Sequence, residues 1–435
     1  MRLRVFSVVI TLSGLLISCG RPSPVYRTPP VEILPEITEA APESDGQTVR
    51  VLLLETSGSV DFETDRAIVT EMEEPGIDGR ALLSSGSHRL SLQGGTVRVV
   101  QGRKSVASAP FIRISPVEGS SFTIDGRSFR GELLCFAKGG KILAVNLIDI
   151  EDYLKGVLPY EIGYLKQDEY EAYKVQAVAS RSYALSKLEA MKDSPYDLKA
   201  TVMDQVYKGI GGEDPRASRA VEETRGLVGT WDGTIITAYY SSCCGGHTAD
   251  IRDGWPWKAY YPYLYGSRDA AVEGGKSFCR ESRHFRWEAD WTGNALQGIL
   301  RKTLPAELGA RVSPFTRLID IRTEGVSASG RVKALVFVTD RGEYRVEGDR
   351  LRWVLRPESA TGPILRSTLF KIEVERSGGR VRSVRVRGGG NGHGTGMCQS
   401  GAIMMAREGY SAEQILLHYY PGITLERIDR GSGPR

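Results

Sequence analysis

The stretch that most constrains this chain is Glu151–Leu188, which reads EDYLKGVLPYEIGYLKQDEYEAYKVQAVASRSYALSKL. A short apolar run over 142–150 predicts a strand, a Pro-Tyr-Glu turn follows, and the remainder predicts an amphipathic helix. Arg181 lies at the edge of the apolar helical face, so we expect a partly buried guanidinium that needs an anionic partner. The face itself has the spacing of a buried helical stripe, with Val175, Val178, Ser182 and Leu185.

Glu161 is the candidate catalytic residue of this stretch. It follows Pro159 in the turn, and among its acidic neighbours it alone lies in an apolar run, Val-Leu-Pro-Tyr-Glu-Ile-Gly. A carboxyl in apolar surroundings has a raised pKa and can act as a general acid near neutrality. No second carboxylate lies at a spacing from Glu161 that would indicate a catalytic pair, which is consistent with a single acid/base. The GxSxG serine elbow and the HExxH zinc helix are both absent.

The rest of the chain is rich in short strands bounded by Gly, Ser and Pro. Its 435 residues are enough for two or three domains, and its 50 glycines favour turns and functional loops over a helical bundle. We therefore expect an α+β fold, β-rich and mixed, with a few helices around a substrate groove. The net charge of +4 with no concentrated basic face gives no indication of a nucleic-acid partner.

The N-terminus reads as a targeting segment. Arg2 and Arg4 precede an apolar run over 5–17 that ends in Leu-Ile-Ser-Cys-Gly. This pattern resembles the bacterial lipoprotein signal, in which Cys19 is acylated; the alternative is an ordinary cleaved signal. It predicts an extracytoplasmic protein, anchored to a membrane by lipid. We divide the chain into a signal peptide (1–18), a Pro-rich tether (19–47), a β-rich N-terminal part (48–140), a core (141–425) and a tail (426–435).

Five further cysteines remain, an odd number that a complete set of disulfides cannot use. The spacing Cys244-x2-His247 and Cys279-x4-His284 offers two thiolates and two imidazoles, the number that a closed tetrahedral zinc site needs. We expect one structural zinc that would hold the long loop over 242–288. A Cys244–Cys279 disulfide and free cysteines are the alternatives.

A glycine loop, GGGNGHGTGM, surrounds His393. It lacks the GxGxxG dinucleotide fingerprint, because its glycines alternate at 390, 392, 394 and 396. Glycine on both sides of His393 would let the backbone approach a ligand while the imidazole projects into a groove. The alternative is a glycine-rich turn with an incidental histidine.

With these residues in view, the chain resembles the SpoIID/LytB family, named after stage II sporulation protein D. The resemblance covers about 49–425. It rests on four motifs in the same order: EDYLKGVLPYEI, YKVQAVASRSYAL, YYSSCCGGHTAD and GGGNGHGTGMCQSGAIMMAREGYSAEQILLHYYPG. The chain departs from the family at Cys398, where serine is common, at Asn391, where an aromatic is common, and at Ile162-Gly163, where Met-Pro is usual.

The resemblance implies a peptidoglycan lytic transglycosylase that cuts between N-acetylmuramic acid and N-acetylglucosamine, preferentially in glycan strands stripped of stem peptides. Glu161 would be the single acid/base, and the product would end in a 1,6-anhydro ring. Gln176, Arg181 and Tyr183 would line the groove, with His393 opposite. Some members carry zinc near the CGGHT motif, which favours Cys244, His247, Cys279 and His284 as ligands.

Two other functions remain open from the sequence. Some relatives are described as amidase enhancers, so the chain could be a non-enzymatic peptidoglycan-binding protein that recruits or stimulates an amidase. A zinc-dependent hydrolase is disfavoured, since four protein ligands would leave the metal no open position.

Overall fold

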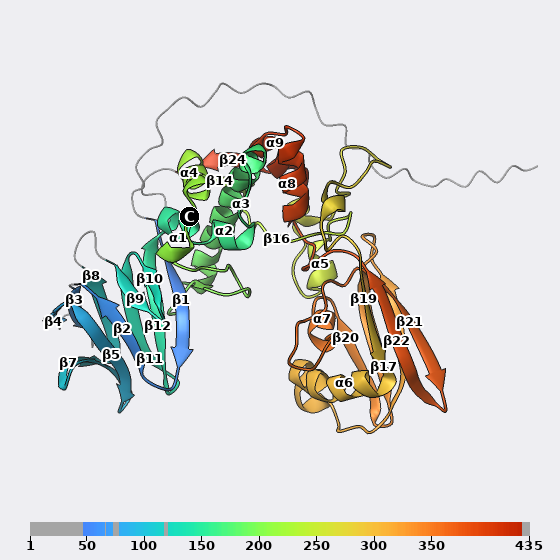
Figure 1. The fold of residues 1–435 in the computed structure, drawn as a ribbon, viewed down its shortest axis with the longest axis horizontal. Helices are drawn as coiled ribbons and strands as arrows, with labels where there is room; N and C mark the ends of the chain where they lie inside the picture. The colour runs from blue at the N-terminus through green and yellow to red at the C-terminus, as the bar shows by residue number, and fades with distance from the viewer. Residues whose placement is uncertain (1–46, 66, 73–77, 117–120, 429–435) are drawn as a thin grey trace, which may run out of the picture. The chain divides into compact units, whose positions relative to one another are not determined.

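The computed structural model describes residues 47–65, 67–72, 78–116 and 121–428 (Figure 1). The predicted signal peptide, Cys19 and all of the predicted tether except Gln47 lie outside these residues. Several sheets alternate with short helices, which confirms the expected α+β class. Across the described ranges, no helix has both the length and the apolar character needed to cross a bilayer.

The N-terminal part contains two sheets. The larger sheet has the order β13 (Leu198–Lys199), β1 (Thr48–Thr56), β12 (Lys141–Asp149), β11 (Glu132–Lys138), β8 (Phe111–Pro116), β3 (Ala67–Met72) and β4 (Asp78–Leu83). The smaller sheet has the order β10 (Arg127–Phe129), β9 (Phe122–Ile124), β2 (Val60–Thr64), β5 (Gly86–Gln93), β6 (Thr96–Gln101) and β7 (Lys104–Ala109). Strand β12 pairs with both β1 and β11, so the sheet continues past residue 140.

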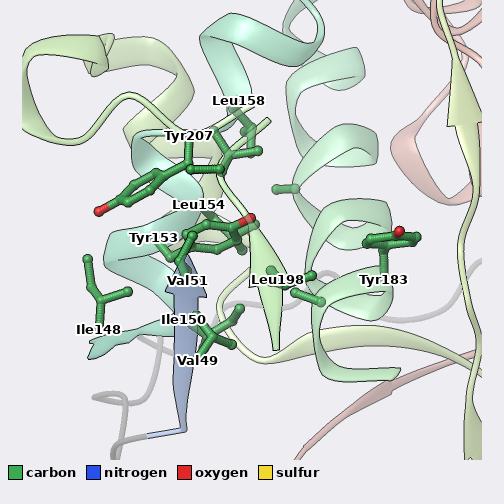
Figure 2. Close-up of a cluster of buried hydrophobic side chains, with 14 of the residues drawn as sticks. Val49, Val51, Ile148, Ile150, Tyr153, Leu154, Leu158, Tyr183, Leu198 and Tyr207 are labelled. Atoms are coloured by element: carbon green, nitrogen blue, oxygen red, sulfur yellow. The ribbon is translucent and has the colours of Figure 1, made fainter. Parts of the chain in front are cut away.

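The large sheet leads directly into the helices. Asp149 ends β12 and caps helix α1 (Ile150–Lys155), because its carboxylate accepts the backbone N–H groups of Glu151 and Asp152. The side chains of the strands and the first helices then share one apolar core (Figure 2). This core includes Val49, Val51, Ile148, Ile150, Tyr153, Leu154, Leu158 and Tyr207. Each such side chain contributes about 1.5–3 kcal/mol when it is fully buried.

Helix α3 (Tyr170–Leu188) is the predicted long helix, but it is not one-sided. The predicted stripe is buried, and so is most of the rest of the helix, including small residues such as Ala172, Ala177 and Ser180. These small side chains let neighbours approach closely. The neighbours are α4 (Pro215–Glu223), α8 (Gln399–Arg407), α9 (Ala412–Tyr419) and β14 (Leu227–Trp231). The helix is therefore enclosed by other elements.

Two short sequence patterns in this region adopt the local structures that are typical of them. Asp232 and Gly233 join β14 to β15 (Thr234–Ile235) with φ of 49° and 71°, and a type I′ turn requires positive φ at both positions. Strand β24 (Thr424–Arg427) completes this small sheet. Ser411 caps α9, with the side chain of Gln414 returning a hydrogen bond to the Ser411 N–H.

Residues from Trp287 to Gly388 build a second apolar core of their own. It is formed by β17 (Trp287–Thr292), α6 (Gly293–Leu308), β18 (Leu318–Val326), β19 (Val332–Thr339), β20 (Gly342–Glu347), α7 (Arg350–Val354), β21 (Phe370–Ser377) and β22 (Arg380–Gly388). Hydrogen bonds tie it to the preceding loop: the Asp349 N–H donates to the Gly254 carbonyl over 2.7 Å. The predicted core over 141–425 thus contains two separately packed parts.

Candidate active site

Glu161 lies at the end of the short helix α2 (Leu158–Glu161), which starts with Pro159 in its first turn. Its Oε1 accepts the backbone N–H of Val206 over 2.6 Å, and its carboxyl is also hydrogen-bonded by the Tyr240 side chain. Burial raises the pKa of Glu161 to about 7, and the two hydrogen bonds lower it by less. The expected raised pKa is confirmed, and its cause is desolvation.

Tyr240 belongs to a buried polar network that the sequence did not reveal. It lies in β16 (Tyr240–Ser241), which pairs in parallel with β23 (Met397–Cys398). The Gln205 amide donates to the Tyr240 hydroxyl over 3.0 Å and to the Ser180 carbonyl over 3.2 Å. Because the hydroxyl oxygen accepts from Gln205, its own hydrogen is free to be donated to Glu161. Tyr240 lies in the motif YYSSCCGGHTAD, whereas no sequence feature distinguished Gln205.

Two of the predicted groove residues lie beneath the surface. Gln176 is 0% exposed; its amide donates to the Ser180 hydroxyl over 2.9 Å, and its carbonyl accepts from Gln399 over 3.1 Å. Tyr183 is 7% exposed, and its hydroxyl donates to Asp204 over 2.9 Å. Both side chains are already bonded within the protein. Gln176 and Tyr183 therefore do not line a groove as expected, because other elements pack over helix α3.

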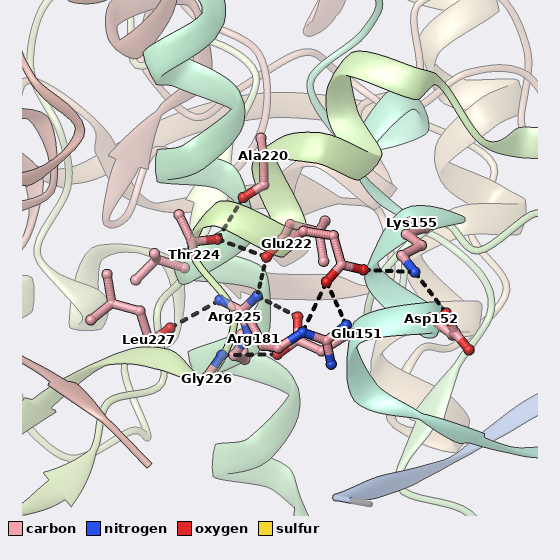
Figure 3. A network of polar contacts seen from close by, with 12 residues as sticks. Glu151, Asp152, Lys155, Arg181, Ala220, Glu222, Thr224, Arg225, Gly226 and Leu227 are labelled. Atoms are coloured by element: carbon pink, nitrogen blue, oxygen red, sulfur yellow. Dashed lines mark hydrogen bonds and ion pairs between the residues drawn. The ribbon is translucent and has the colours of Figure 1, made fainter. Parts of the chain in front are cut away.

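Arg181 is fully buried against Glu151 (Figure 3). Its Nε donates to Glu151 Oε1 over 2.9 Å and its Nη2 to Oε2 over 2.5 Å, while Nη1 donates to the Leu227 carbonyl over 3.0 Å. The predicted anionic partner is therefore confirmed as Glu151. The predicted contact with substrate is wrong, because the Arg181 side chain is 0% exposed and its donors are used inside the fold.

The structure brings His393 to the candidate site. Its Nδ1 accepts the Thr395 N–H over 3.1 Å, and the ring also hydrogen-bonds the Tyr240 backbone. Burial lowers the pKa of His393 to about 4, so the imidazole is neutral at neutral pH. Glu161 and His393 thus both contact Tyr240, one through its hydroxyl and the other through its backbone.

The alternating glycines have a packing reason. Gly396 has φ of 69°, and a Cβ there would lie 2.0 Å from the Tyr239 carbonyl oxygen. The loop can therefore run against the backbone before β16 only with glycine at this position. This close approach sets His393 beside Tyr240.

An aromatic wall, formed by Tyr239, Trp255 and His393, adjoins this site. The Trp255 ring lies 4.9 Å from His393 and 5.2 Å from Tyr239, between ring centroids. The Lys258 ammonium lies 4.5 Å from the Tyr239 ring and 4.6 Å from the Trp255 ring. Burial lowers the pKa of Lys258 to about 8. The rings are tilted against one another, by 36° between Tyr239 and Trp255 and by 47° between Trp255 and His393. An aromatic surface with a cation beside it therefore continues from His393.

The cysteines gather in a buried cluster with a different membership from the predicted one. The ligand atoms of Cys244, Asp269, Cys279 and Cys398 all lie within 4.8 Å of one another. The Sγ atoms of Cys244 and Cys279 are 3.7 Å apart and not bonded, so the disulfide alternative does not hold here. Tetrahedral zinc with Zn–S bonds of about 2.3 Å separates its sulfur atoms by roughly 3.8 Å, which fits this spacing. We name these four residues the cysteine cluster.

The two histidines predicted as ligands lie outside this cluster. His247 Nδ1 lies 2.7 Å from the Thr248 carbonyl oxygen, which orients its ring locally. The His284 ring is bonded by Arg366 and, over 3.2 Å, by Arg283. Two guanidinium groups beside an imidazole oppose the approach of a metal cation. The ligand set Cys244, His247, Cys279 and His284 is therefore corrected at both histidines.

Asp269 and Cys398 take the places of the two histidines in the cluster, and the sequence distinguished only one of these two residues. Cys398 stood out as a cysteine where serine is common, whereas Asp269 had no distinguishing context. The Asp269 carboxylate accepts the Cys279 N–H over 2.9 Å and the Tyr419 hydroxyl over 2.6 Å. These bonds fix the carboxylate beside the sulfurs, as an outer shell does for a metal ligand.

Comparisons with known proteins agree with the motifs. Residues 138–231 match the model of the stage II sporulation protein family, SpoIID, and residues 270–396 match a domain of unknown function, DUF8618. An uncharacterized protein of Brachyspira hyodysenteriae is 29% identical over 71% of this chain and 75% of its own length. Stage II sporulation protein D of Bacillus amyloliquefaciens is 24% identical over 66% of this chain and 76% of its own length.

The amidase enhancer of Bacillus subtilis is 28% identical over 82% of this chain. The match covers 52% of the amidase enhancer, so this chain spans about half the length of that relative.

Proposed function

This chain belongs to the SpoIID/LytB family, and on that premise we propose that it is a peptidoglycan lytic transglycosylase with Glu161 as its single acid/base. The observation that carries the proposal is the half-buried Glu161 side chain, whose carboxyl has its pKa raised to about 7 by desolvation. At neutral pH a large fraction of such a group holds the proton that a leaving glycosidic oxygen needs.

Glu161 would act twice in one turnover. It gives its proton to the glycosidic oxygen as the bond from the muramoyl C1 to that oxygen breaks. The resulting carboxylate then takes the proton of the muramoyl O6 hydroxyl as O6 bonds to C1, which closes the 1,6-anhydro ring. The proton count balances, and no water is consumed. Tyr240 and the Val206 N–H would hold the carboxylate in place through both steps.

The surroundings of Glu161 support a single acid/base. A hydrolytic glycosidase normally pairs two carboxyl groups, and a nearby carboxylate would itself raise the pKa. Within the described residues, the causes of the Glu161 shift are burial, Val206 and Tyr240, with no carboxylate among them.

Digestion of purified sacculi, with and without stem peptides, tests this proposal. The soluble form that begins at residue 20 should release fragments with anhydro-muramoyl ends, read by mass spectrometry. The Glu161→Gln variant should release none, because the amide cannot donate a proton in the same way. Reducing ends would instead mean hydrolysis with a second catalytic group.

Recruitment of an amidase is the second candidate, and the amidase enhancer relative favours it. In that function the chain would bind peptidoglycan without cutting it. No product from either form of the protein, with binding to sacculi intact, would replace the transglycosylase proposal with this one.

We further propose that the cysteine cluster holds one structural zinc. Three buried sulfur ligands and a fixed carboxylate suit zinc, and four protein ligands leave no open position for catalysis. When bound, the metal would fasten the loop that carries Cys244 and Cys279 to Cys398, which precedes α8.

We also propose that Cys19 carries acyl groups that hold the mature chain at an extracytoplasmic membrane face, on the strength of the sequence pattern alone. The mass of the mature protein should include these acyl groups. A mature N-terminus at a residue other than Cys19 would contradict the proposal.

A further inference from the structure

A groove of about 330 Å³ adjoins the aromatic wall. It combines residues from the loop after α5 (Ile251–Gly254), from the helices α6 and α7, and from the segment before β14. It is lined by Met203, Trp255, Trp257, Glu307, Asp349, Arg350 and Trp353. We name it the tryptophan groove, since three of the six tryptophans of the chain line it.

Two apolar side chains of this groove are exposed, and its other two tryptophans, Trp255 and Trp353, are half-buried. Trp257 is 56% exposed, and Met203 is 61% exposed. The Arg350 guanidinium lies 5.0 Å from the Trp257 ring, which restricts the ring from one side. Contiguous exposed apolar side chains on a rigid support are typical of a binding site.

The support is rigid because two segments are joined at the groove. The Asp349 N–H donates to the Gly254 carbonyl over 2.7 Å, directly before Arg350 and Trp255 respectively. The Asp349 carboxylate is itself paired with Arg352 over 3.0 Å. The loop and the start of α7 are therefore fixed to each other.

The polar groups of the groove have hydrogen-bonding capacity to spare. Among the described residues, neither Arg350 nor Glu307 forms a hydrogen bond or ion pair with another side chain. Burial raises the pKa of Glu307, as expected for a carboxyl at the edge of an apolar surface. The groove thus offers one unused donor group and one unused acceptor group around flat aromatic rings.

This combination matches the chemistry of a pyranose. A sugar ring has an apolar face of C–H groups, which an aromatic ring can cover, and a rim of hydroxyl and amide groups, which need donors and acceptors. Trp255 belongs both to the aromatic wall beside His393 and to the groove. The groove therefore continues the surface that starts at the candidate active site.

We propose that the tryptophan groove binds additional sugar units of the glycan strand on which Glu161 acts. The inference rests on the proposed function for the identity of the strand, and it gives the segment over 270–396 a role in substrate binding. Glu307, Arg350 and Trp353 all come from that segment.

Binding of an N-acetylglucosamine hexamer to the mature Glu161→Gln chain tests the proposal, since this variant removes turnover. Tryptophan fluorescence should change on binding. Trp257→Ala should weaken the dissociation constant about tenfold, the size of effect typical of an aromatic anchor. Arg350→Ala should weaken it as well, through lost hydrogen bonds and a less restrained Trp257.

Tyr260→Ala is the matched control. Tyr260 is 50% exposed and lies 4.9 Å from the Arg252 guanidinium, but it does not line the groove. It should leave hexamer binding unchanged. Since Trp257 is largely exposed, its loss should not alter the melting temperature, which confirms that the variant is folded.

The two proposals can fail separately. In the chain with Glu161 intact, Trp257→Ala should raise KM for glycan strands while kcat is kept. If the chain does not cleave glycan strands but Trp257→Ala still weakens hexamer binding, the transglycosylase proposal is wrong and the proposal of sugar binding in the tryptophan groove is supported. If Trp257→Ala cleaves glycan strands with unchanged KM and binds the hexamer as before, the proposal of sugar binding in the groove is wrong. Binding of free stem peptide in place of the hexamer would also contradict it.

Discussion

At the scale of single residues, opposing effects set the pKa of Glu161. Burial raises it to about 7, and the hydrogen bonds from the Val206 N–H and the Tyr240 hydroxyl lower it by less. The acid step needs the protonated form, so activity should fall as pH rises through about 7. Removing the Tyr240 hydroxyl removes a group that stabilises the carboxylate, which raises the pKa further.

Tyr240→Phe should therefore move the loss of activity to higher pH. The pH dependence of sacculus digestion, taken under conditions that report kcat, measures this. Tyr183→Phe is the control, because the Tyr183 hydroxyl donates to Asp204 and not to Glu161, and its profile should match the unchanged protein. A Tyr240→Phe profile that is unchanged, or that moves to lower pH, would contradict the assigned hydrogen bond.

At the scale of elements, the Arg181–Glu151 pair joins helices α1 and α3, and Glu151 also accepts the Gly226 N–H over 3.0 Å. Arg181→Met would leave the Glu151 carboxylate buried without its cation. We expect it to lower the free energy of unfolding by roughly 3–5 kcal/mol. Urea unfolding of the soluble form measures the change.

The exposed pair Arg219–Glu223 on α4 provides the comparison. Arg219→Ala should cost less than about 1 kcal/mol, because the Arg219 side chain is 71% exposed and water screens the pair. Equal losses in the two variants would show that the buried pair does not support the fold. Since the described chain has two apolar cores, the Arg181 variant should shift only the transition of the first core.

At the scale of the whole molecule, the cysteine cluster joins segments that are far apart in sequence. Elemental analysis of the purified mature chain should find about one zinc per chain, as four protein ligands form one site. Asp269→Asn and Cys398→Ser should each reduce the zinc content. Removal of the zinc by a chelator should lower the melting temperature of the protein.

His247→Ala, His284→Ala and Cys135→Ala should all keep the metal. Cys135 is buried in β11, outside the cluster, so it controls for the loss of a cysteine as such. Loss of zinc in either histidine variant, with zinc kept in Cys398→Ser, would restore the ligand set expected from the sequence.

What the sequence determined by itself is local or carried by motifs. The Asp232-Gly233 turn, the Ser411 cap and the α+β class follow from short-range patterns. The raised pKa of Glu161 follows from an apolar run, and the family from four motifs in order. Such features depend on neighbouring residues, and the sequence displays those directly.

Only the tertiary structure decided which distant residues meet. It buried Gln176 and Arg181, because α3 is enclosed on most sides, and it placed Tyr240 against Glu161. It also exchanged His247 and His284 for Asp269 and Cys398 in the cysteine cluster. The spacing of ligands along a chain does not fix their distance in space, since that distance depends on how separate segments pack.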